Sequence, residues 1–412
     1  MVQSLLIEHN DPQGEHNDPQ AERSDTKGER SDTKGERSDT KGERSDTKGE
    51  RSDTKGEGSV RRGQSAGTQT RVLLSIIIVS YNTREITLDC LRTLYAELEA
   101  PSLEAGDQDA SIAFDRSTAK VIVVDNASSD GSPAAIRAAF PQVRLLQNEK
   151  NAGFGAANNQ AMSGAGGDFF LLLNSDAFPK PGAIRALLAH LRAHPEIGLV
   201  GPRLLNPDGT LQLSCFRFPS PAGIWAENLW LSALLPNHPS LGYYRRWAHD
   251  EERRVDFVIG ACLLVRRAVY LEVGGFDEDF FMYQEETDWQ RRMQDRGWRV
   301  GFTPAASVTH LGGASGASEK ARINGHFFES MERYLWKHYG AAGLLSLKLS
   351  MLVGCSLRLL LWAGVAATLP RRRALACSKV RLMAWLCLRQ ATTWRRFPRN
   401  RRARSLRSTE SA

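Results

Sequence analysis

The chain has 412 residues, of which 41% are hydrophobic, so it is long enough for one large domain or two ordinary ones. Its formal net charge of +7 is unevenly distributed, because the residues from Ala341 onward hold 15 Lys/Arg and one acidic residue, against 39 Lys/Arg and 46 Asp/Glu before them. The basicity therefore belongs to the C-terminal region and does not indicate nucleic-acid binding by the core. The six cysteines contain no Cys-x-x-Cys pair, which argues against a zinc cluster and a secreted disulfide framework.

The N-terminal part is repetitive. Residues 8–56 are seven tandem heptapeptides, two of the Glu-His-Asn-Asp-Pro-Gln type and five copies of Glu-Arg-Ser-Asp-Thr-Lys-Gly, in which Ala21 is the one apolar residue. Because such repeats have nothing to place in a coiled-coil seam, we expect residues 1–70 to be a disordered tail, with a binding array as the alternative. Met1 to Ile7 lack the charged start and long apolar core of a secretory signal, so no export is expected.

From residue 71 the chain alternates short apolar runs with helical patterns. We expect strands at residues 72–80, 120–124, 143–147 and 169–173, helices at 83–98, before Phe140 and from Asn151, and an inserted loop at 100–119. The run 169–173 has no polar alternation, which is typical of a strand covered on both faces. The alternation predicts an α/β fold with a mainly parallel sheet flanked by helices.

Three of these strands end in polar residues: Tyr81-Asn82, Asp125-Asn126 and Asn174-Ser175-Asp176. In open α/β sheets ligands bind in the crevice at the carboxyl ends of the strands, so these side chains are candidates for one site. A carboxylate at that edge can hold Mg²⁺ or Mn²⁺ on a diphosphate. The alternative for Ser175 or Asp176 is capping of the helix that follows Pro181.

Two further segments carry candidate chemistry. Residues 256–265 are predicted to be a strand containing a glycine turn, and Glu285, Glu286 and Asp288 crowd the first turn of a helix that closes at Gly297. The helix dipole explains at least one of these acids, whereas a carboxylate over an acceptor hydroxyl would serve as a general base. Residues 300–305 are predicted to be a strand that is left by a glycine-rich loop carrying His310.

Residues 151–159 open a helix with small residues, so its backbone can approach a ligand or pack closely on the sheet. With the order of the other motifs, 79–82, 123–128, 173–176 and 273–289, the chain from about Leu73 to Tyr339 resembles the inverting GT-A glycosyltransferases of family 2, especially the bacterial rhamnosyltransferase-like branch. The resemblance implies a GT-A, Rossmann-like domain at 71–340, with a nucleotide-binding half at 71–205 and an acceptor half at 206–340.

The resemblance also implies roles for individual residues. The nucleotide-sugar donor would contact Tyr81, Asn82, Asp125, Asn126, Asn151, Gly153, Phe154, Asn158, Asn174 and Asp176. Asp176 and His310 would hold the divalent cation, Mg²⁺ or Mn²⁺. Glu286 would be the catalytic base at a position where the family commonly has Asp, with Glu285 as the fallback. The acceptor would lie against Gly260, Ala261, Phe276, Asp277 and Asp288.

The implied reaction is metal-assisted transfer of a sugar, rhamnose as the first choice, from a nucleotide-diphosphate sugar to a cell-surface glycan or lipid-linked acceptor with inversion. A nucleotidyltransferase on a similar fold is one alternative, although it has no need of the base segment. A non-catalytic, membrane-bound carbohydrate-binding protein is the other, and it would need no aligned Asp176 and Glu286.

The C-terminal region differs in character. Residues 344–369 are strongly apolar but contain Lys348 and Arg358, and the longest uncharged run, 359–370, is shorter than the ~20 residues of a spanning helix. We therefore expect residues 341–412 to be basic amphipathic helices that lie on an anionic membrane surface. This predicts a cytoplasmic protein attached peripherally to the inner face of the cell membrane; a packed helical hairpin is the alternative.

Overall fold

The structure is a computed structural model that describes residues 72–99, 117–235, 247–312 and 320–393. By compactness the chain divides into residues 1–69 and 70–412, and every described residue belongs to the second unit. The predicted disordered tail, most of the predicted inserted loop and the last residues of the basic region lie outside the described residues. All six cysteines are described, and all are free thiols.

The N-terminal half of the fold alternates strands and helices as predicted. In chain order its elements are β1 (Leu74–Ser80), α2 (Arg84–Glu99), β2 (Ala119–Asp125), α3 (Ser132–Ala139), β3 (Arg144–Gln147), α4 (Phe154–Ser163), β4 (Phe169–Asn174), β5 (Ala177–Pro179), α5 (Ala183–Ala193) and β6 (Ile197–Leu205).

The C-terminal half is less regular and ends in long helices. Its elements are β7 (Leu211–Gln212), β8 (Cys215–Phe216), α6 (Pro221–Asn228), α7 (Leu231–Leu234), β9 (Arg253–Val255), β10 (Phe257–Val258), β11 (Cys262–Arg266), α8 (Arg267–Val273), α9 (Glu285–Asp295), β12 (Arg299–His310), α10 (Lys320–Thr368), the 3₁₀ turn η3 (Pro370–Arg372) and α11 (Arg373–Thr392).

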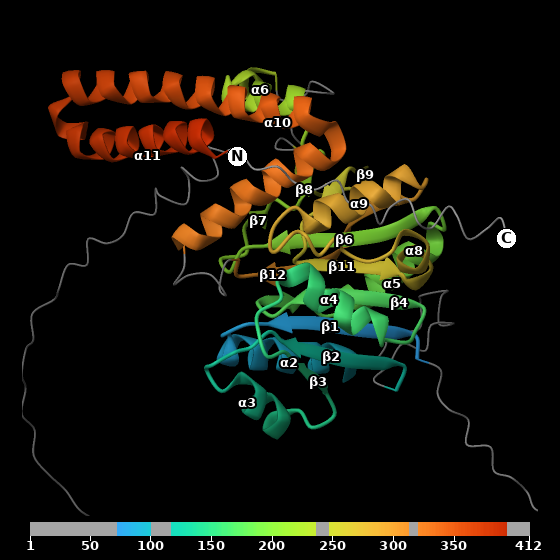
Figure 1. The fold of residues 1–412 in the computed structure, drawn as a ribbon. Helices are drawn as coiled ribbons and strands as arrows, with labels where there is room; N and C mark the ends of the chain where they lie inside the picture. The colour runs from blue at the N-terminus through green and yellow to red at the C-terminus, as the bar shows by residue number, and fades with distance from the viewer. Residues whose placement is uncertain (1–71, 100–116, 236–246, 313–319, 394–412) are drawn as a thin grey trace, which may run out of the picture. The chain divides into compact units, whose positions relative to one another are not determined.

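One sheet organises the domain (Figure 1), with strand order β3-β2-β1-β4-β11-β6-β12-β5 and with β7 and β9 pairing at its side. The three longest ladders are parallel and join β1 to β2, β1 to β4 and β6 to β12, and β2 also pairs in parallel with β3. Antiparallel ladders join β11 to β4 and β6, and β5 to β12. The sheet is thus mixed but mainly parallel, which confirms the predicted α/β class with its GT-A-like arrangement.

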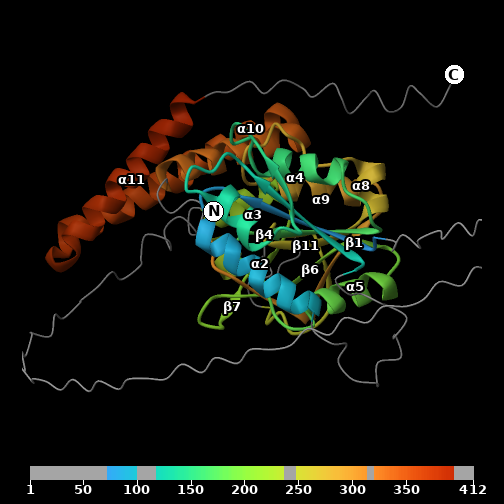
Figure 2. The same ribbon diagram turned by 90° about the horizontal axis from the view of Figure 1, so that it is seen from below.

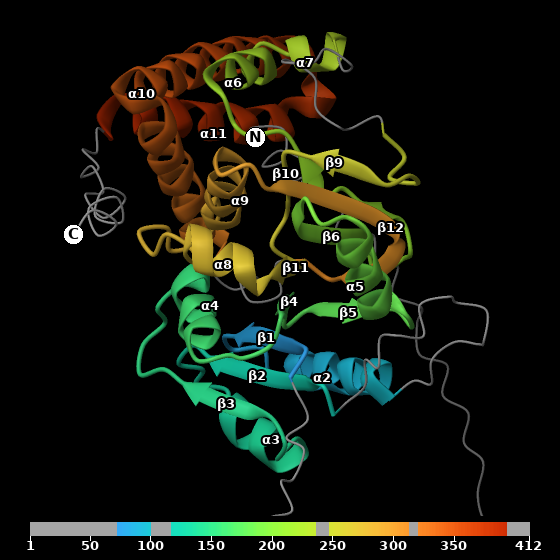
Figure 3. The same cartoon turned by 90° about the vertical axis from the view of Figure 1, so that its right-hand side faces the viewer.

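Helices cover both faces of the sheet (Figures 2 and 3). On β1, Ile76 and Ile78 pack in one buried cluster with apolar residues of α2, α3 and α5. Ile77 points the other way, into a second cluster with α4, α8 and α9. Both side-chain directions of the strand are therefore apolar, because neither face meets water, and this explains the unbroken hydrophobic runs in the sequence.

Two features of the second half differ from the predictions. The expected single strand at 256–265 is two strands, β10 and β11, which pair in different sheets on either side of Gly260. The expected exit loop with His310 is wrong, because β12 continues to His310 past a register shift between Thr303 and Ser307. The extension is held by β5, whose Ala177 pairs with His310.

β6 was not among the predicted elements, because two glycines and a proline in its sequence disfavour a strand interior. The glycines are required by close packing: a Cβ at Gly198 would lie 2.9 Å from a methyl group of Val269, and one at Gly201 would lie 2.9 Å from Val258. β6 is thus a central strand whose composition is set by what packs on it.

The C-terminal region forms helices, as predicted. α10 is interrupted at Gly340, whose φ of 66° and ψ of −159° are not helical. Beyond Gly340 it runs beside α11 as a hairpin, and its neighbour on another side is α6, where Trp225 Nε1 donates to Ser346 Oγ at 3.0 Å (Figure 1). The packed-hairpin geometry that was the alternative at the sequence level is therefore present.

Candidate active site

The parallel register aligns the ends of the three strands on which the sequence placed polar residues. Ser80 at the end of β1 pairs with Asp125 at the end of β2, and Val79 pairs with Asn174 at the end of β4. Because carboxyl ends of parallel strands meet at one edge, Asp125 and Asn174 lie on either side of β1 there. The expected grouping of these strand ends is therefore observed.

Asp176 and His310 come together through the short β5–β12 ladder. Asp176 precedes β5, and its Oδ1 lies 3.3 Å from Nε2 of His310. The amide of Asn174 lies 3.4 Å from the same nitrogen, and its Oδ1 is a buried oxygen without a hydrogen-bond partner among the described residues. Asp176 and His310 are both buried, so this group of oxygen and nitrogen atoms is only slightly wetted.

Gln212, which the sequence did not single out, sets the tautomer of His310. Its Nε2 donates to Asn206 Oδ1 at 3.0 Å and to the carbonyl of His310 at 3.1 Å, which assigns the remaining amide atom as Oε1. That Oε1 lies 2.7 Å from His310 Nδ1 and can only accept, so Nδ1 carries the proton. In the neutral ring Nε2 then carries no proton, and its lone pair is directed at the Asp176 carboxylate.

This donor set fits a divalent cation. A carboxylate oxygen and an imidazole lone pair 3.3 Å apart repel each other unless a proton or a cation lies between them. An outer partner that holds the remote ring N–H is also the usual accompaniment of a metal-binding histidine. Asp176, His310 and the unpartnered Asn174 Oδ1 offer oxygen and nitrogen ligands of the kind that Mg²⁺ or Mn²⁺ accepts.

Asn126 organises the small-residue loop that precedes α4. Its Nδ2 donates to Asn151 Oδ1 at 2.8 Å and to the Gly153 carbonyl at 3.2 Å, and its Oδ1 accepts from the N–H of Ala152 at 3.0 Å. Gly153, with a φ of 90°, leaves no room for a side chain, because a Cβ would lie 2.4 Å from the carbonyl oxygen of Phe281. Asn126 and Asn151 thus engage each other and shape this loop.

Asp125 and Asn82 both accept hydrogen bonds from the segment that follows β2. Asp125 Oδ2 accepts from the Ser128 N–H at 3.1 Å, whereas its buried Oδ1 has no partner among the described residues. Asn82, at a φ of 52°, accepts from the Ser129 N–H at 2.8 Å. Tyr81, next to it, is half-buried at the same edge. One oxygen of Asp125 is therefore buried and unpartnered at the edge that carries Tyr81.

Glu286 faces the β10–β11 turn. A Cβ built on Gly260 would lie 3.8 Å from Glu286 Cβ and 3.6 Å from the ring of Phe154, so these three residues meet at one point. The Gly260 N–H donates to the Glu286 carboxylate, and the next residue, Ala261, accepts the Asn174 N–H at 2.9 Å. The backbone of residues 260–261 thereby joins the Glu286 side of the site to the Asp176 side.

The two neighbouring glutamates differ in access. Glu285 is buried against α4, 3.7 Å from where a Cβ of Gly155 would lie, whereas Glu286 is partly exposed. Burial raises the pKa of Glu285 well above its ordinary value, and the charge of Glu286 raises it further. Burial also raises the pKa of Glu286, against hydrogen bonds from backbone N–H groups. Each has an Oε2 without a partner among the described residues.

The other residues expected to contact the acceptor lie deeper. Phe276 is buried against Trp289, with ring centroids 4.4 Å apart, and Asp277 pairs with Lys337. Asp288 is completely buried and is held by Arg292, Lys337 and His338 at 2.8–2.9 Å. Asn158, expected near the donor, is buried with its amide on the Phe154 carbonyl. In this conformation these four side chains support the site from within the fold.

The comparisons with known proteins agree with this arrangement. Residues 75–274 match the family described as glycosyl transferase family 2. An N-acetylglucosaminyl-diphospho-decaprenol L-rhamnosyltransferase of Mycobacterium tuberculosis is 34% identical over 230 residues, which cover 51% of this chain and 72% of the relative. The chain belongs to glycosyl transferase family 2.

Another relative and two solved structures are also similar. A low-salt glycan biosynthesis hexosyltransferase of Haloferax volcanii is 23% identical over 241 residues, 58% of this chain and 66% of that protein. The solved structure of GalNAc-T7 with UDP, GalNAc and Mn²⁺ has a TM-score of 0.45 at 15% identity, over 66% of this chain and 49% of that one. A Pyrobaculum calidifontis mannosyltransferase with GDP-Man and Mn²⁺ has a TM-score of 0.43 at 16% identity, over 78% and 88%.

Family membership makes the protein a glycosyltransferase, and this decides against the non-catalytic carbohydrate-binding alternative. The family match ends at residue 274, before the segment that carries Glu285 and Glu286. The structure nevertheless joins that segment to the matched region, because the Phe154 N–H donates to the Phe281 carbonyl at 3.0 Å. The segment that carries the two glutamates therefore packs on the start of α4, within the matched region.

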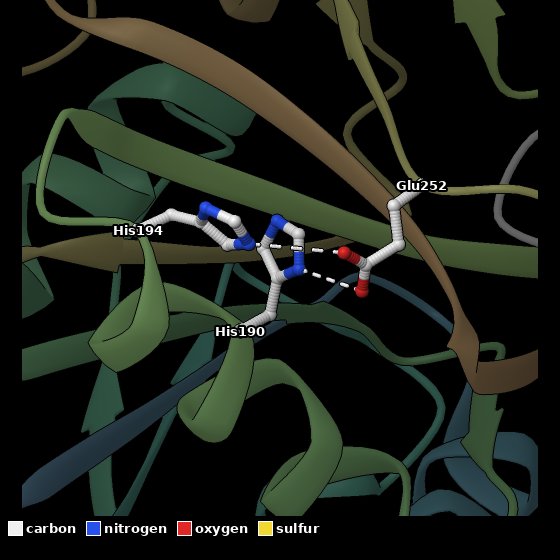
Figure 4. A group of neighbouring side chains, drawn as sticks. All are labelled: His190, His194 and Glu252. Carbon is white, nitrogen blue, oxygen red and sulfur yellow. Dashed lines mark hydrogen bonds and ion pairs between the residues drawn. The ribbon is translucent and has the colours of Figure 1, made fainter.

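A second group of side chains could also hold a metal ion, at the other end of the strands. His190 of α5, His194 after it and Glu252 before β9 place one ligand atom each within 4.8 Å of one another (Figure 4). His190 Nδ1 lies 2.9 Å from Glu252 Oε1, which also accepts from Thr303 Oγ1 at 2.9 Å. These contacts attach residues 247–255 to α5 without a metal, and they lie near the start of β12, whereas His310 ends it.

Proposed function

We propose that this glycosyltransferase transfers a hexose or deoxyhexose, with rhamnose as the first candidate, from a nucleotide-diphosphate sugar to a hydroxyl of a lipid-linked or cell-surface glycan, with inversion at C1. The observation that carries the proposal is the junction at Gly260–Ala261. Its backbone contacts Glu286 on one side and Asn174, next to the Asp176–His310 pair, on the other. A potential base and a potential diphosphate site are therefore joined by two consecutive residues of the chain.

The reaction is a single displacement. The acceptor oxygen forms a bond to C1 while the bond from C1 to the diphosphate oxygen breaks, and the nucleoside diphosphate leaves with the electron pair. Glu286 accepts the proton of the acceptor hydroxyl as that oxygen attacks. Because attack comes from the face opposite to the leaving group, the configuration at C1 inverts. Glu286 lies beside Gly260 and Phe154, where an acceptor can approach over a small residue.

Environment suits Glu286 to this role better than Glu285. Both pKa values are raised by burial, which strengthens a carboxylate as a base once it is ionised. Glu285, however, is buried against α4, so an acceptor hydroxyl has no access to it in this conformation. Glu285 instead acts on its neighbour, since two adjacent carboxylates resist simultaneous ionisation.

The donor is positioned by the other edge of the crevice. A divalent cation, when bound, supplies positive charge that neutralises the diphosphate and stabilises it as a leaving group. Asp176 and His310 would hold it, and Gln212 keeps the lone pair of His310 directed inward. The unpartnered Oδ1 of Asp125 is placed to accept a hydroxyl or N–H of the nucleoside, beside Tyr81.

The sugar and the acceptor rest on the similarity to the Mycobacterium tuberculosis enzyme, whose name specifies L-rhamnose and a decaprenol-diphosphate-linked acceptor. At 34% identity these specificities are carried over as the first hypothesis and not as properties of this chain. A panel of nucleotide sugars, with released nucleoside diphosphate as the readout, tests the donor. NMR of the product anomer tests inversion, and retention of configuration would contradict the single displacement.

The cation site has its own test. Asp176→Asn replaces a charged ligand by a neutral amide, so we expect loss of transfer and weaker, cation-dependent donor binding. His194→Ala is the matched control, because it removes a ligand from the second candidate group while leaving the crevice intact. Donor affinity is measured by calorimetry with Mn²⁺ and with chelator. An Asp176→Asn enzyme that binds donor with unchanged cation dependence would disprove the site.

A further inference from the structure

The hairpin formed by α10 after Gly340 and by α11 has its charges and its leucines in unusual places. Lys348 and Arg358 are the charged residues between Ala341 and Thr368, and their side chains are 0% and 3% exposed. Lys348 Nζ donates to Glu332 Oε1 at 2.7 Å and to the Thr393 carbonyl at 2.6 Å. The basic groups that interrupted the apolar sequence are therefore directed into the protein.

Arg358 is buried on the side of α10 that packs on α6 and the residues after it. Its guanidinium donates to the Asn228 carbonyl at 2.8 Å and lies 4.2 Å from the ring centroid of Trp230. Asn228 also donates to Ser350 Oγ at 3.2 Å. Both charged groups of this part of α10 are thus buried, beside apolar side chains such as Leu347 and Met351, and neither is directed to the outward side of the helix.

The outward side of α10 is correspondingly apolar. Exposed residues recur at helical spacing along it, between 41 and 67% exposed: Leu345, Leu349, Val353, Leu357, Leu360 and Leu361. Steps of three and four residues place them on one stripe, about 24 Å long at 1.5 Å per residue. An exposed stripe of this length without a charge is far more apolar than the usual surface of a soluble protein.

The charges that border this stripe are positive. Arg371, Arg372 and Arg373 are exposed at the turn where α10 ends and α11 begins, and Arg381 is exposed on α11. No acidic residue occurs from Ala341 to Thr393, a range that the structure describes completely. An apolar face bordered by cations complements an anionic lipid surface. A second copy of the chain would present the same cations and so would not complement them.

We propose that the outward stripe of α10, with the arginines of the following turn, docks in the plane of an anionic phospholipid bilayer. The stripe enters the boundary between headgroups and acyl chains, and Arg371–Arg373 contact the phosphates. By length and composition Gly325–Thr368 could cross a bilayer, but 44% of its most apolar stretch is buried inside the fold, where Lys348 and Arg358 also make their contacts. The outward stripe is the part that is left for lipid. The packed hairpin and the membrane-bound helix, alternatives at the sequence level, are thus two sides of one element. This inference does not depend on the proposed sugar transfer.

The test uses the full-length protein and flotation with vesicles of phosphatidylcholine, with and without an equal amount of phosphatidylglycerol. Wild-type protein should float with the anionic vesicles and lose affinity as NaCl is raised. The double variant Leu349→Glu/Leu357→Glu should bind at least about tenfold more weakly, because two charges enter the apolar stripe. Leu271→Glu is the matched control, since Leu271 on α8 is 63% exposed outside the hairpin. Its binding should equal that of the wild type.

A second variant tests the charges separately. Arg371→Gln/Arg372→Gln/Arg373→Gln alters no internal contact of the hairpin and should lower affinity for anionic vesicles by about two orders of magnitude. Equal flotation of the wild type and the double leucine variant would overturn the proposal. So would sedimentation velocity that shows a wild-type dimer, no vesicle binding, and dissociation of the dimer by the leucine substitutions, because the stripe would then be covered by a second copy.

Discussion

Two groups of carboxylates at the start of α9 lie within four residues of one another and have opposite environments. Asp288 is completely buried and surrounded by Arg292, Lys337 and His338. Burial alone would raise its pKa, but the hydrogen bond from His338 and the charges of Arg292 and Lys337 lower it far below the ordinary value. Glu285 and Glu286 receive no cation among the described residues, and burial raises both pKa values.

This difference in environment distinguishes a structural carboxylate from reactive ones within one acidic cluster. A carboxylate whose charge is fully compensated is a poor base and a good anchor, and Asp288 joins α9 to α10 in that way. A buried carboxylate without compensation destabilises the fold, and such groups persist at sites where their reactivity is used. The comparison supports the catalytic role proposed for Glu286 beside Glu285 and a structural role for Asp288, and each role can be tested by substitution.

The largest expected effect is on Glu286→Gln. The amide retains the shape of the side chain but cannot accept the acceptor proton, so kcat should fall by about 10² to 10⁴ while donor affinity changes little. Single-turnover kinetics with saturating donor, alongside donor binding by calorimetry, separates the two quantities. If Glu286→Gln retains wild-type turnover and Glu285→Gln does not, the base is Glu285.

Asp288→Asn should act on stability instead. The substitution leaves Lys337 and Arg292 near a neutral group, and because these cations are partly exposed we expect a loss of about 3 kcal/mol, at the low end for a broken buried pair. Asp295→Asn, at the exposed end of the same helix, is the matched control and should change stability by less than about 0.5 kcal/mol. Urea unfolding followed by circular dichroism measures both. Equal effects would show that the cluster around Asp288 contributes no special stabilisation.

The sequence predicted the parts of this site that depend on local pattern. β1, β2 and β4 were recognised because strands buried on both faces are continuously apolar, and their polar ends marked the crevice. The acidic start of α9 could also be recognised in the sequence, but the different environments of Asp288 and the two glutamates could not. Lys337 and His338, which compensate Asp288, lie some fifty residues away in the chain, and no spacing rule connects them.

Residues that act through long-range strand pairing could not be predicted. His310 was expected on a loop because β5, the strand that extends β12 to it, has only three residues and no recognisable pattern. Gln212 sets the His310 tautomer from the two-residue strand β7, in a segment with no motif. β6 was not predicted because strand propensity counts its glycines against a strand. These glycines are needed instead for close packing against Val258 and Val269.

An effect of intermediate size is expected on the pH dependence of turnover. Glu286 must be ionised to accept a proton, and burial raises its pKa above the ordinary value of 4.5. Activity should therefore be full at high pH and decline, as pH falls, around a pKa higher than that of a free glutamate. Glu285, whose pKa is raised further by the charge of Glu286, is still protonated where Glu286 titrates, so Glu285→Gln removes no charge and should leave this decline in place. A pH–rate profile of kcat for both enzymes checks this, and a decline that moves to lower pH in the variant would show that Glu285 is ionised in the working enzyme.

The smallest effect is expected on the stability of Glu285→Gln. Because burial raises the folded-state pKa of Glu285 above its unfolded value, the protonated side chain stabilises the fold, and this contribution is lost as pH rises through the folded pKa. Gln mimics the protonated form at every pH. The variant should therefore unfold at the same temperature as the wild type in acid and a few degrees higher at neutral pH. Asp288→Asn should show the reverse, with its deficit largest at neutral pH and smaller in acid, because the stabilisation from Asp288 is lost as pH falls through its lowered pKa. Thermal unfolding of the wild type and the two variants across pH tests both expectations. A Glu285→Gln variant that is less stable than the wild type at neutral pH would mean that the ionised Glu285 carboxylate is compensated. The distinction between Glu285 and Asp288 would then fail.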